Sequence, residues 1–333
     1  AGVFARSPHF DEAFLEKMRR STGGQIDCLA HHLHTRGNWR ISHLNCLLFV
    51  SLVVPGLDRY LTLATQGLNE CFYRQIGSDG SHEEHNPSYH GWMCRLFTRL
   101  WRLSQARPKL DLRLDTRRVM RMWDYTVCSA APDGGSPGLH DGPAWKPRSA
   151  HADRPAMHQA QRSWDRRQAL LEEAGLGNDP DFDLEAEPSR YFSDAGQVFL
   201  RDSWRPDATW LSFDATRWGG GHCHLSRLGV SLYHRDRMLL SDPGSFTYEM
   251  SDPFAVYCKS TPAHNTINLG GMSQTDANPD GTRVRLFDRA ALAESHYEGG
   301  YYPGTYTWGW RYGKGEGVFG KHHRALLWLK GRG

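Results

Sequence analysis

The chain opens with apolar side chains that recur every three or four residues between Phe10 and Ala130. That spacing predicts amphipathic helices, and Gly, Pro or a short polar turn separates each apolar segment from the next. Helices of this length joined by short turns are typical of an antiparallel helical array. The pattern predicts helices over residues 10–33, 38–54, 57–75, 88–106 and 115–130.

The character of the chain changes after residue 130. Pro, Gly, Asp, His and Arg dominate residues 131–185, and within them only residues 157–174 have a helical pattern. Stretches this rich in turn-forming residues are typical of connections rather than of packed elements. We therefore expect a long connection over 131–185, attached to a helical domain that covers residues 1–185.

From Tyr191 onward the apolar pattern has a period of two. Short alternating runs bounded by Gly, Pro and Asp predict strands of an antiparallel sandwich. Because the helices precede the strands, the fold class is α+β with segregated domains, the second covering residues 186–333. The predicted strands are residues 197–202, 209–215, 229–233, 237–241, 265–269, 283–287 and 324–329.

Composition narrows the class of partner. The 333 residues carry 40 Lys and Arg against 37 Asp and Glu, a net charge of +3, whereas nucleic-acid binding favours a clustered basic surplus. No apolar run approaches the ~20 residues that a membrane-spanning helix needs. The 12 Trp, 13 Tyr, 14 Phe and 18 His instead favour a carbohydrate-handling or metal-binding protein. We expect neither a nucleic-acid nor a membrane partner, and the sequence leaves the oligomeric state open.

The ends of the chain indicate whether the sequence is a fragment, and its cysteines indicate the redox state of its cellular compartment. The sequence begins Ala-Gly-Val, without an initiator Met or a signal peptide, and stops within a strand-like run, which we interpret as a fragment truncated at the C-terminus. Its seven Cys are an odd number and form no CxxC motif, a pattern that favours free thiols and a reducing compartment. The sequence does not fix the localisation.

The richest chemical stretch is the glycine run 219–221 followed by His222 and His224. Asp242 follows the next apolar strand, and His264 precedes a further one. His224, Asp242 and His264 would form a set of two imidazoles and one carboxylate that suits zinc with an open coordination position. Among 18 His such spacing also arises by chance, so spacing alone favours ordinary packing roles.

Two further stretches look like helix starts. Residues 79–90 form a polar turn in which Asn86 and Pro87 mark a helix N-terminus, placing Tyr89 and His90 in the first turn. Taken alone, this reads as an ordinary capped helix.

The second helix start is residues 37–40, where Gly37 and a polar residue open an apolar helix. Asn38 as a simple N-cap is the natural local interpretation.

Together, in this order, the stretches resemble the heparinase II/III-like polysaccharide lyases. The resemblance spans about residues 35–330. At two positions the pattern differs, because Trp39 stands where relatives often carry His and Ser226 where they commonly carry Asp. The matching motifs are Gly37-Asn38-Trp39; Asp79-Gly80 to Glu84 with Asn86-Pro87 and Tyr89-His90; Gly-Gly-His222-x-His224; Asp242-Pro243-Gly244 with Tyr248; and Ser260-Thr261 with Ala263-His264-Asn265-Thr266.

The resemblance implies an incomplete α/α toroid followed by an antiparallel β-sandwich, with the active site in the cleft between them. It implies catalysis by Asn38, Tyr89 and His222, and one structural divalent metal, zinc by ligand type, on His224, Asp242 and His264. Candidate substrate-binding residues, for which capping, solvated or surface roles are equally open, are Arg40, Glu84, His90 and Arg217.

The implied activity is cleavage of an acidic, uronate-containing polysaccharide by β-elimination. A uronyl C5-epimerase begins with the same proton abstraction and stays open as an alternative, as does a non-catalytic glycan-binding relative. Relatives that degrade external polymers are commonly periplasmic or secreted, whereas the free cysteines favour the cytoplasm.

Overall fold

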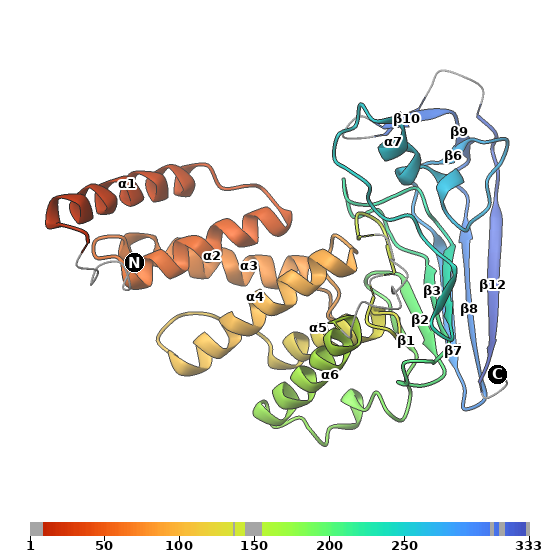
Figure 1. Ribbon diagram of the computed structural model, residues 1–333, viewed down its shortest axis with the longest axis horizontal. Coiled ribbons are helices and arrows are strands. Elements are labelled where there is room, and N and C mark those ends of the chain that lie inside the picture. The colour runs from red at the N-terminus through yellow and green to blue at the C-terminus, as the bar shows by residue number, and fades with distance from the viewer. Residues whose placement is uncertain (1–8, 136, 144–154, 307–309, 313–316, 331–333) are drawn as a thin grey trace. The chain divides into compact units, whose positions relative to one another are not determined.

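The computed structural model describes residues 9–135, 137–143, 155–306, 310–312 and 317–330 (Figure 1). The chain divides into two compact units. One comprises Ala1–Ile76 with Leu96–Asp115, and the other Gly77–Arg95 with Thr116–Gly333. Among the described residues, no helix combines the length and the apolar character that a membrane span requires.

The first unit is helical. Fully buried apolar residues of α2, such as Ile41 and Leu44, and of α3, such as Leu68 and Phe72, form its interior. The Phe72 ring lies 5.1 Å from that of Phe97 in α4. The predicted helices are therefore confirmed, with ends shifted by a few residues. They are α1 (Glu12–His31), α2 (Gly37–Val53), η2 (Asp58–Tyr60), α3 (Leu61–Gln75) and α4 (Pro87–Ala106), whose first turns belong to the second unit.

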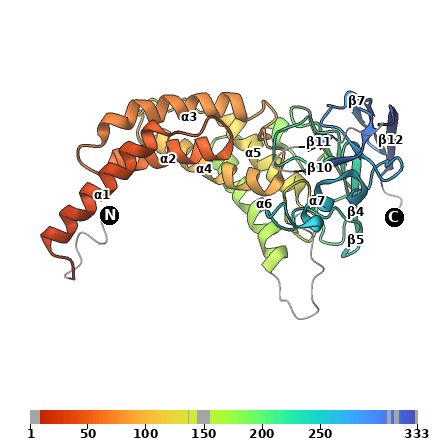
Figure 2. The same ribbon diagram turned by 90° about the horizontal axis from the view of Figure 1, so that it is seen from above.

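The second unit contains α5 (Thr116–Ser129), α6 (Pro155–Glu173) and two main antiparallel sheets (Figures 1 and 2). The five-stranded sheet follows chain order: β1 (Arg190–Phe192), β2 (Gln197–Arg201), β3 (Trp210–Asp214), β4 (Gly229–His234) and β5 (Arg237–Leu240). The three-stranded sheet has the order β12 (His322–Leu329), β8 (Ala290–Tyr297), β7 (Asp280–Leu286). Smaller elements are η3 (Pro180–Phe182), α7 (Pro253–Lys259), η4 (Thr261–Ala263), β6 (Ser273–Gln274), β9 (Tyr301–Tyr302), β10 (Gly304–Tyr306) and β11 (Trp310–Tyr312).

Both faces of the five-stranded sheet are covered. On one face, Phe199 and Trp210 pack with Tyr125 of α5. On the other, Val198 packs with Ala291 of β8. Every residue of β2 is buried, so this strand lies at the centre of the unit and anchors the loops at its ends.

A buried ion pair joins α5 to α6. Arg167 Nε donates to Asp124 Oδ1 at 2.6 Å, and Arg167 Nη2 donates to the carbonyl of Phe182 in η3 at 2.5 Å. Burial raises the pKa of Asp124 to about 6, while the charge of Arg167 opposes that rise. The pair is therefore ionised at neutral pH and ties three segments together.

The structure corrects three expectations. Residues 265–269 do not form a strand, because Asn265 Nδ2 donates to the Ser241 carbonyl and Thr266 Oγ1 to that of Arg227. The sequence pattern missed β8, the central strand of the three-stranded sheet. The described start of the expected connection is packed, since Leu139 belongs to the core. All seven cysteines lie outside disulfide bonds.

Gly80 lies in the turn before α4, and its conformation requires glycine. Its φ is +89°, and a Cβ there would lie 2.3 Å from the backbone carbon of Arg121. We expect Gly80→Ala to lower the free energy of unfolding by at least about 2 kcal/mol, since strain and a backbone clash add. Urea unfolding measures the change. Gly91→Ala is the control, because its Cβ would meet nothing closer than 3.6 Å. Equal stability of the two variants would contradict the prediction.

Candidate active site

Tyr89 lies in the first turn of α4, and its placement follows from the local sequence. Asn86 Oδ1 accepts hydrogen bonds from the backbone N–H groups of Ser88 (2.8 Å) and Tyr89 (3.2 Å), as an N-cap side chain does. Pro87 is the first helical residue, where its missing N–H costs nothing. The cap thus fixes the start of the helix and presents the partly exposed Tyr89 ring.

His222 lies in the loop between β3 and β4. At Gly219 a Cβ would lie 2.4 Å from the Glu83 carbonyl and 2.7 Å from the His85 ring. Only glycine therefore allows the loop that carries His222 to lie against the segment that leads into α4. This close approach brings together two motifs that are distant in the sequence.

Tyr89, His222 and Tyr248 form one group of side chains. The Tyr89 and His222 ring centroids are 4.5 Å apart, and those of His222 and Tyr248 are 6.3 Å apart. The hydroxyl oxygens of Tyr89 and Tyr248 lie 2.8 Å apart. Burial, the hydrogen bond with Tyr89 and the charge of Asp141 raise the pKa of Tyr248 well above its usual value. Tyr248 therefore keeps its proton and is suited to donate it to the Tyr89 oxygen.

Asp141 accepts hydrogen bonds from His222 and from two neighbouring side chains. Its Oδ2 accepts from His222 Nδ1 at 2.8 Å and its Oδ1 from His224 Nε2 at 2.9 Å, while Lys259 Nζ donates to Oδ1 as well. Burial alone would raise the pKa of Asp141, but hydrogen bonds from His222 and His224 and the charge of Lys259 outweigh burial and hold it well below its usual value. Asp141 is therefore a carboxylate.

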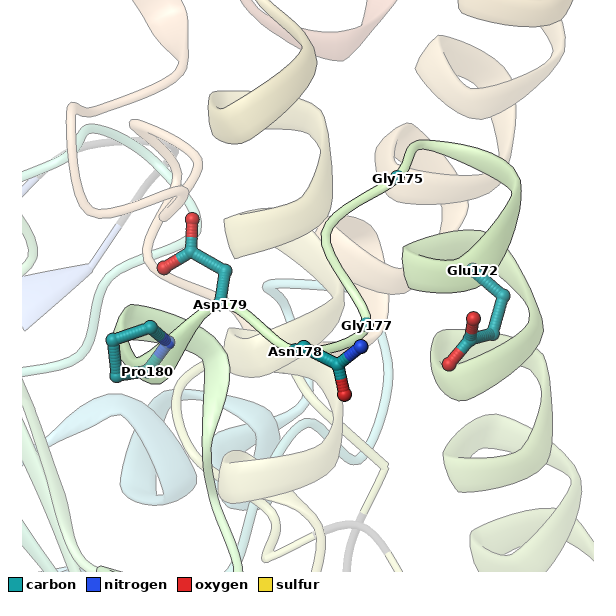
Figure 3. Close-up of a pocket in the computed structure, with 6 residues that line it drawn as sticks. All are labelled: Glu172, Gly175, Gly177, Asn178, Asp179 and Pro180. Carbon is teal, nitrogen blue, oxygen red and sulfur yellow. The ribbon is translucent and has the colours of Figure 1, made fainter.

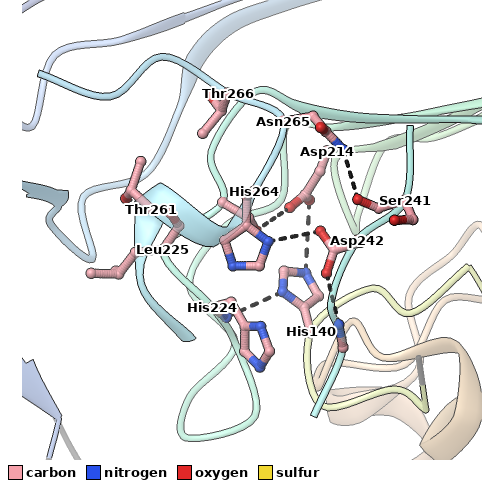
Figure 4. A network of polar contacts seen from close by, with 12 residues as sticks. His140, Asp214, His224, Leu225, Ser241, Asp242, Thr261, His264, Asn265 and Thr266 are labelled. Atoms are coloured by element: carbon pink, nitrogen blue, oxygen red, sulfur yellow. Dashed lines mark hydrogen bonds and ion pairs between the residues drawn. The ribbon is translucent and has the colours of Figure 1, made fainter. Parts of the chain in front are cut away.

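His224, Asp242 and His264 come together as a buried group, and one ligand atom from each lies within 4.8 Å of the others (Figure 4). His224 precedes β4, Asp242 follows β5, and His264 follows η4. His264 Nδ1 donates to Asp242 Oδ2 at 2.8 Å. The predicted set therefore has the proximity that a shared metal requires.

The unpaired atoms of this group fit a cation. His224 Nδ1 and His264 Nε2 are buried without a hydrogen-bond partner, and such atoms are rare in proteins unless a bound water or ion satisfies them. Burial lowers the pKa of His224 to about 3, against the opposing hydrogen bond to Asp141. A neutral imidazole is the form that ligates metals. The donor set of two nitrogens and a carboxylate suits zinc.

A further histidine and carboxylate lie beside the cluster. His140 Nδ1 accepts from the backbone N–H of His224 at 3.2 Å, and His140 Nε2 lies 3.7 Å from Asp214 Oδ1 (Figure 4). Ser226, which stands where Asp was expected from the resemblance, donates to Asp214 Oδ2 at 2.8 Å. This neighbourhood therefore keeps a buried carboxylate, supplied by β3.

The remaining predicted residues differ in their surroundings. Arg217 is exposed, whereas Glu84 is buried. Asn38, which is buried, and Arg40, which lies 3.6 Å from a Glu70 oxygen, belong to the first unit, so their part in the site stays a prediction. Asn38 is the second residue of α2 rather than its N-cap, which is Arg36.

His90 lies in the interior of the second unit. Its side chain is fully buried, and its Nε2 donates to the Met122 carbonyl at 2.8 Å. These contacts give it a structural role, and its part in substrate binding stays a prediction. His90 packs the start of α4 against α5, its ring 4.2 Å from that of Tyr125.

The buried histidines make the fold sensitive to acid. Burial lowers the pKa of His90 to about 4 and that of His85 to about 3. Both are neutral when folded and take up protons on unfolding below about pH 6.5, so stability present at neutral pH is lost as the pH falls toward 4. We expect each to contribute a slope of up to about 1.4 kcal/mol per pH unit. Urea unfolding between pH 7 and 4.5, with a chelator present, measures that slope. An unchanged slope in His90→Gln would contradict the assignment to His90.

A separate pocket of about 480 Å³ lies where α6 ends (Figure 3). Glu172, Asn178 and Asp179 contribute its polar side chains. It contains none of the predicted site residues, and its lining offers no pair of acid and base side chains like Tyr89 and His222. It is therefore not the candidate active site.

Sequence reasoning missed Asp141 and Lys259 and gave Tyr248 no role. Asp141 is 81 residues from His222, and Lys259 is 118 residues from Asp141, so no spacing rule connects them. The available signal was the His140-Asp141-Gly142 sequence in a stretch interpreted as a connection. Tyr248 was visible as the last part of the Asp242-Pro243-Gly244 motif.

Two family models match the chain in order. The family model described as heparinase II/III N-terminus matches residues 2–170, and that described as heparinase II/III-like, C-terminal, matches residues 185–329. No curated protein matches the chain.

Solved structures show the same fold. The heparan sulfate lyase HepC from Pedobacter heparinus has 22% identity and a TM-score of 0.67, with 98% of this chain and 49% of that chain covered. Heparinase III has 19% identity and a TM-score of 0.72, with 97% and 50% covered. The chain thus spans about half the length of these structures. Since the N-terminal model alone matches more than half of the chain and the C-terminal model follows it in order, this chain belongs to the heparinase II/III family.

Proposed function

We propose that the protein is a polysaccharide lyase that cleaves an acidic, uronate-containing glycan by β-elimination. The observation that carries the proposal is the contact between the Tyr89 and His222 rings, 4.5 Å apart, beside the Tyr89–Tyr248 hydroxyl pair. Two groups able to move protons thus lie side by side, as an acid and a base that serve one sugar residue must. The family membership and the named activities of the two solved relatives support the same class.

The chemistry requires three roles. Removal of the C5 proton of a uronate places negative charge on the adjacent carboxylate, which must be neutralised. A base must take that proton, and an acid must protonate the departing O4. We assign His222 as the base and Tyr89 as the acid that serves O4. Asn38, through its side-chain amide, is the proposed neutraliser.

Tyr248 supports Tyr89 in this scheme. Because its raised pKa keeps Tyr248 protonated, it is able to donate a hydrogen bond to the Tyr89 oxygen, which lies 2.8 Å away. That bond stabilises the phenolate left when Tyr89 gives its proton to O4. The same stabilised phenolate allows Tyr89 to take a proton as well, where acid and base act from one side of the sugar.

Two arginines are proposed to bind the anionic polymer. Arg217 is exposed beside the glycine loop that carries His222, and a guanidinium binds carboxylate or sulfate through paired hydrogen bonds. Arg40 is the second candidate. Glu84, buried in the segment before α4, is a further candidate for substrate binding.

One divalent metal, zinc by its donor set, is proposed to bind His224 Nδ1, His264 Nε2 and Asp242. Its role would be structural, fixing the loops on either side of His222. Calcium and manganese fit less well, since they prefer oxygen ligands. Metal analysis of protein purified without a histidine tag tests this assignment, and stoichiometric absence would refute it.

We further propose that the helices form an incomplete α/α toroid and the strands a β-sandwich, as domains 1–185 and 186–333. The family models, which end at residue 170 and begin at residue 185, support such a boundary. The core shared by β2, β3 and β8 supports two packed sheets.

The decisive experiment is a panel of uronate polysaccharides incubated with the protein. A lyase produces an unsaturated product whose double bond absorbs in the ultraviolet. Incorporation of solvent deuterium at C5 without chain scission would instead identify an epimerase. Polymer binding without either product, unchanged when Tyr89 and His222 are both replaced, would identify a non-catalytic glycan-binding protein.

A further inference from the structure

Asp141 accepts more hydrogen bonds than a residue with only a packing role needs. Its side chain is fully buried, and its two oxygens accept from three donors, two in the loop between β3 and β4 and one at the end of α7. Oδ2 faces His222, whereas Oδ1 faces both His224 and Lys259. One carboxylate thus lies between the proposed base and a proposed metal ligand.

The chemistry of a carboxylate decides which nitrogens carry hydrogen. An ionised carboxylate only accepts hydrogen bonds, so each imidazole nitrogen that faces it must be an N–H. His222 therefore has its hydrogen on Nδ1 and its lone pair on Nε2. His224 has its hydrogen on Nε2 and its lone pair on Nδ1, the atom that is buried without a partner beside Asp242 and His264. The two histidines are held as opposite tautomers.

Lys259 fixes the orientation of this carboxylate. It is the last residue of α7, its side chain is 2% exposed, and its Nζ donates to Asp141 Oδ1 and, at 3.4 Å, to the Gly221 carbonyl. Its second contact lies in the glycine loop directly before His222. Rotation of Asp141 would cost the buried ammonium its charged partner, so Oδ2 stays directed at His222.

We propose that Asp141 is a positioning residue that sets the tautomers of His222 and His224 together, and so couples the proton-accepting nitrogen of one to the metal-binding nitrogen of the other. The catalytic consequence rests on the proposed lyase function. The assignment of the two tautomers does not rest on that function, because the tautomers are measured without any substrate.

The first test is the histidine tautomers of the native protein. Long-range nitrogen-15 NMR of histidine-labelled protein distinguishes a protonated Nδ1 from a protonated Nε2, and the variants His222→Gln and His224→Gln assign the two signals. We expect Nδ1–H for His222 and Nε2–H for His224. Any other pair of tautomers in the native protein would overturn the proposal, whether or not a variant of Asp141 folds.

The second test is Asp141→Asn. The amide oxygen is expected to stay with Lys259 and His224, so the amide N–H turns to His222 and requires its Nδ1 to accept. The His222 hydrogen then moves to Nε2, while His224 keeps its hydrogen on Nε2 and its lone pair on Nδ1. We expect kcat to fall by at least about 100-fold, with KM changed less than about threefold. A retained Nδ1–H signal for His222 would overturn the proposal.

Lys259→Met is the matched control. It removes the third contact of Asp141 but leaves both imidazoles facing a carboxylate, so stability should fall while the tautomers stay native. If Asp141 were only structural, both variants would lose activity in proportion to their loss of stability, which would overturn the proposal. Should the native protein cleave no polymer, the proposed function fails, and the tautomer signals still decide the role of Asp141.

Discussion

Replacing Tyr89 by Phe is expected to reduce kcat for elimination by about 10²–10⁴-fold, with little change in KM. The variant keeps the ring that lies 4.5 Å from His222 and loses only the hydroxyl that pairs with Tyr248. Binding contacts are therefore preserved, whereas the proton for the departing O4 is not available from this position. Initial rates from the ultraviolet absorbance of the unsaturated product measure the change.

The control for Tyr89→Phe is Tyr257→Phe. Tyr257 is an exposed tyrosine of α7, and its hydroxyl makes a single long contact of 3.4 Å with the Pro262 carbonyl. That variant should retain native rates. If Tyr89→Phe also retained native elimination, Tyr89 would not be the acid, and the proposed mechanism would have to be abandoned.

Asp124→Ala is expected to lower the free energy of unfolding by about 3–5 kcal/mol, the usual cost of leaving one member of a buried ion pair without its partner. The Arg167 side chain is only 2% exposed. Its guanidinium would keep its contact with the Phe182 carbonyl but lose its counter-charge. Urea or thermal unfolding measures the loss.

The matched control is the double variant Asp124→Leu with Arg167→Met. Replacing a buried ion pair by apolar side chains of similar volume is often neutral or stabilising. We expect the double variant to be more stable than Asp124→Ala alone, since no charge stays buried. A double variant as unstable as the single one would show that lost packing, and not an unpaired charge, causes the effect.

The sequence pattern predicts elements well where one face of an element is buried. The helix 38–54 and the strand 197–202 lie within a residue or so of α2 and β2, because their apolar residues have the period of the element they form. β8 lacks such a signal, since its sequence Ala-Ala-Leu-Ala-Glu begins with residues that favour helices. Pairing with β7 and β12 on both sides overrides that preference.

The residues of the candidate site likewise differ in whether the sequence predicts them. The metal-type cluster follows from motifs. His224 precedes β4, Asp242 follows β5 and His264 follows η4, and the structure brings the three together. Asp141 could not be found in this way, because its contacts depend on the packing of a turn that carries no periodic pattern. The buried state of His90 was equally hidden, since helix periodicity does not say which polar residue faces the interior.

Gly219 has a consequence for laboratory evolution of this scaffold. Libraries that vary the His222 loop to change polymer preference will sample side chains at a position where a Cβ would lie 2.4 Å from the Glu83 carbonyl. We expect most such members to push the loop away from the segment that leads to Tyr89 and to lose the proposed activity whatever sugar they recognise. A library that holds residue 219 as glycine and diversifies the exposed Arg217 instead leaves the proposed catalytic residues unchanged while the specificity is searched.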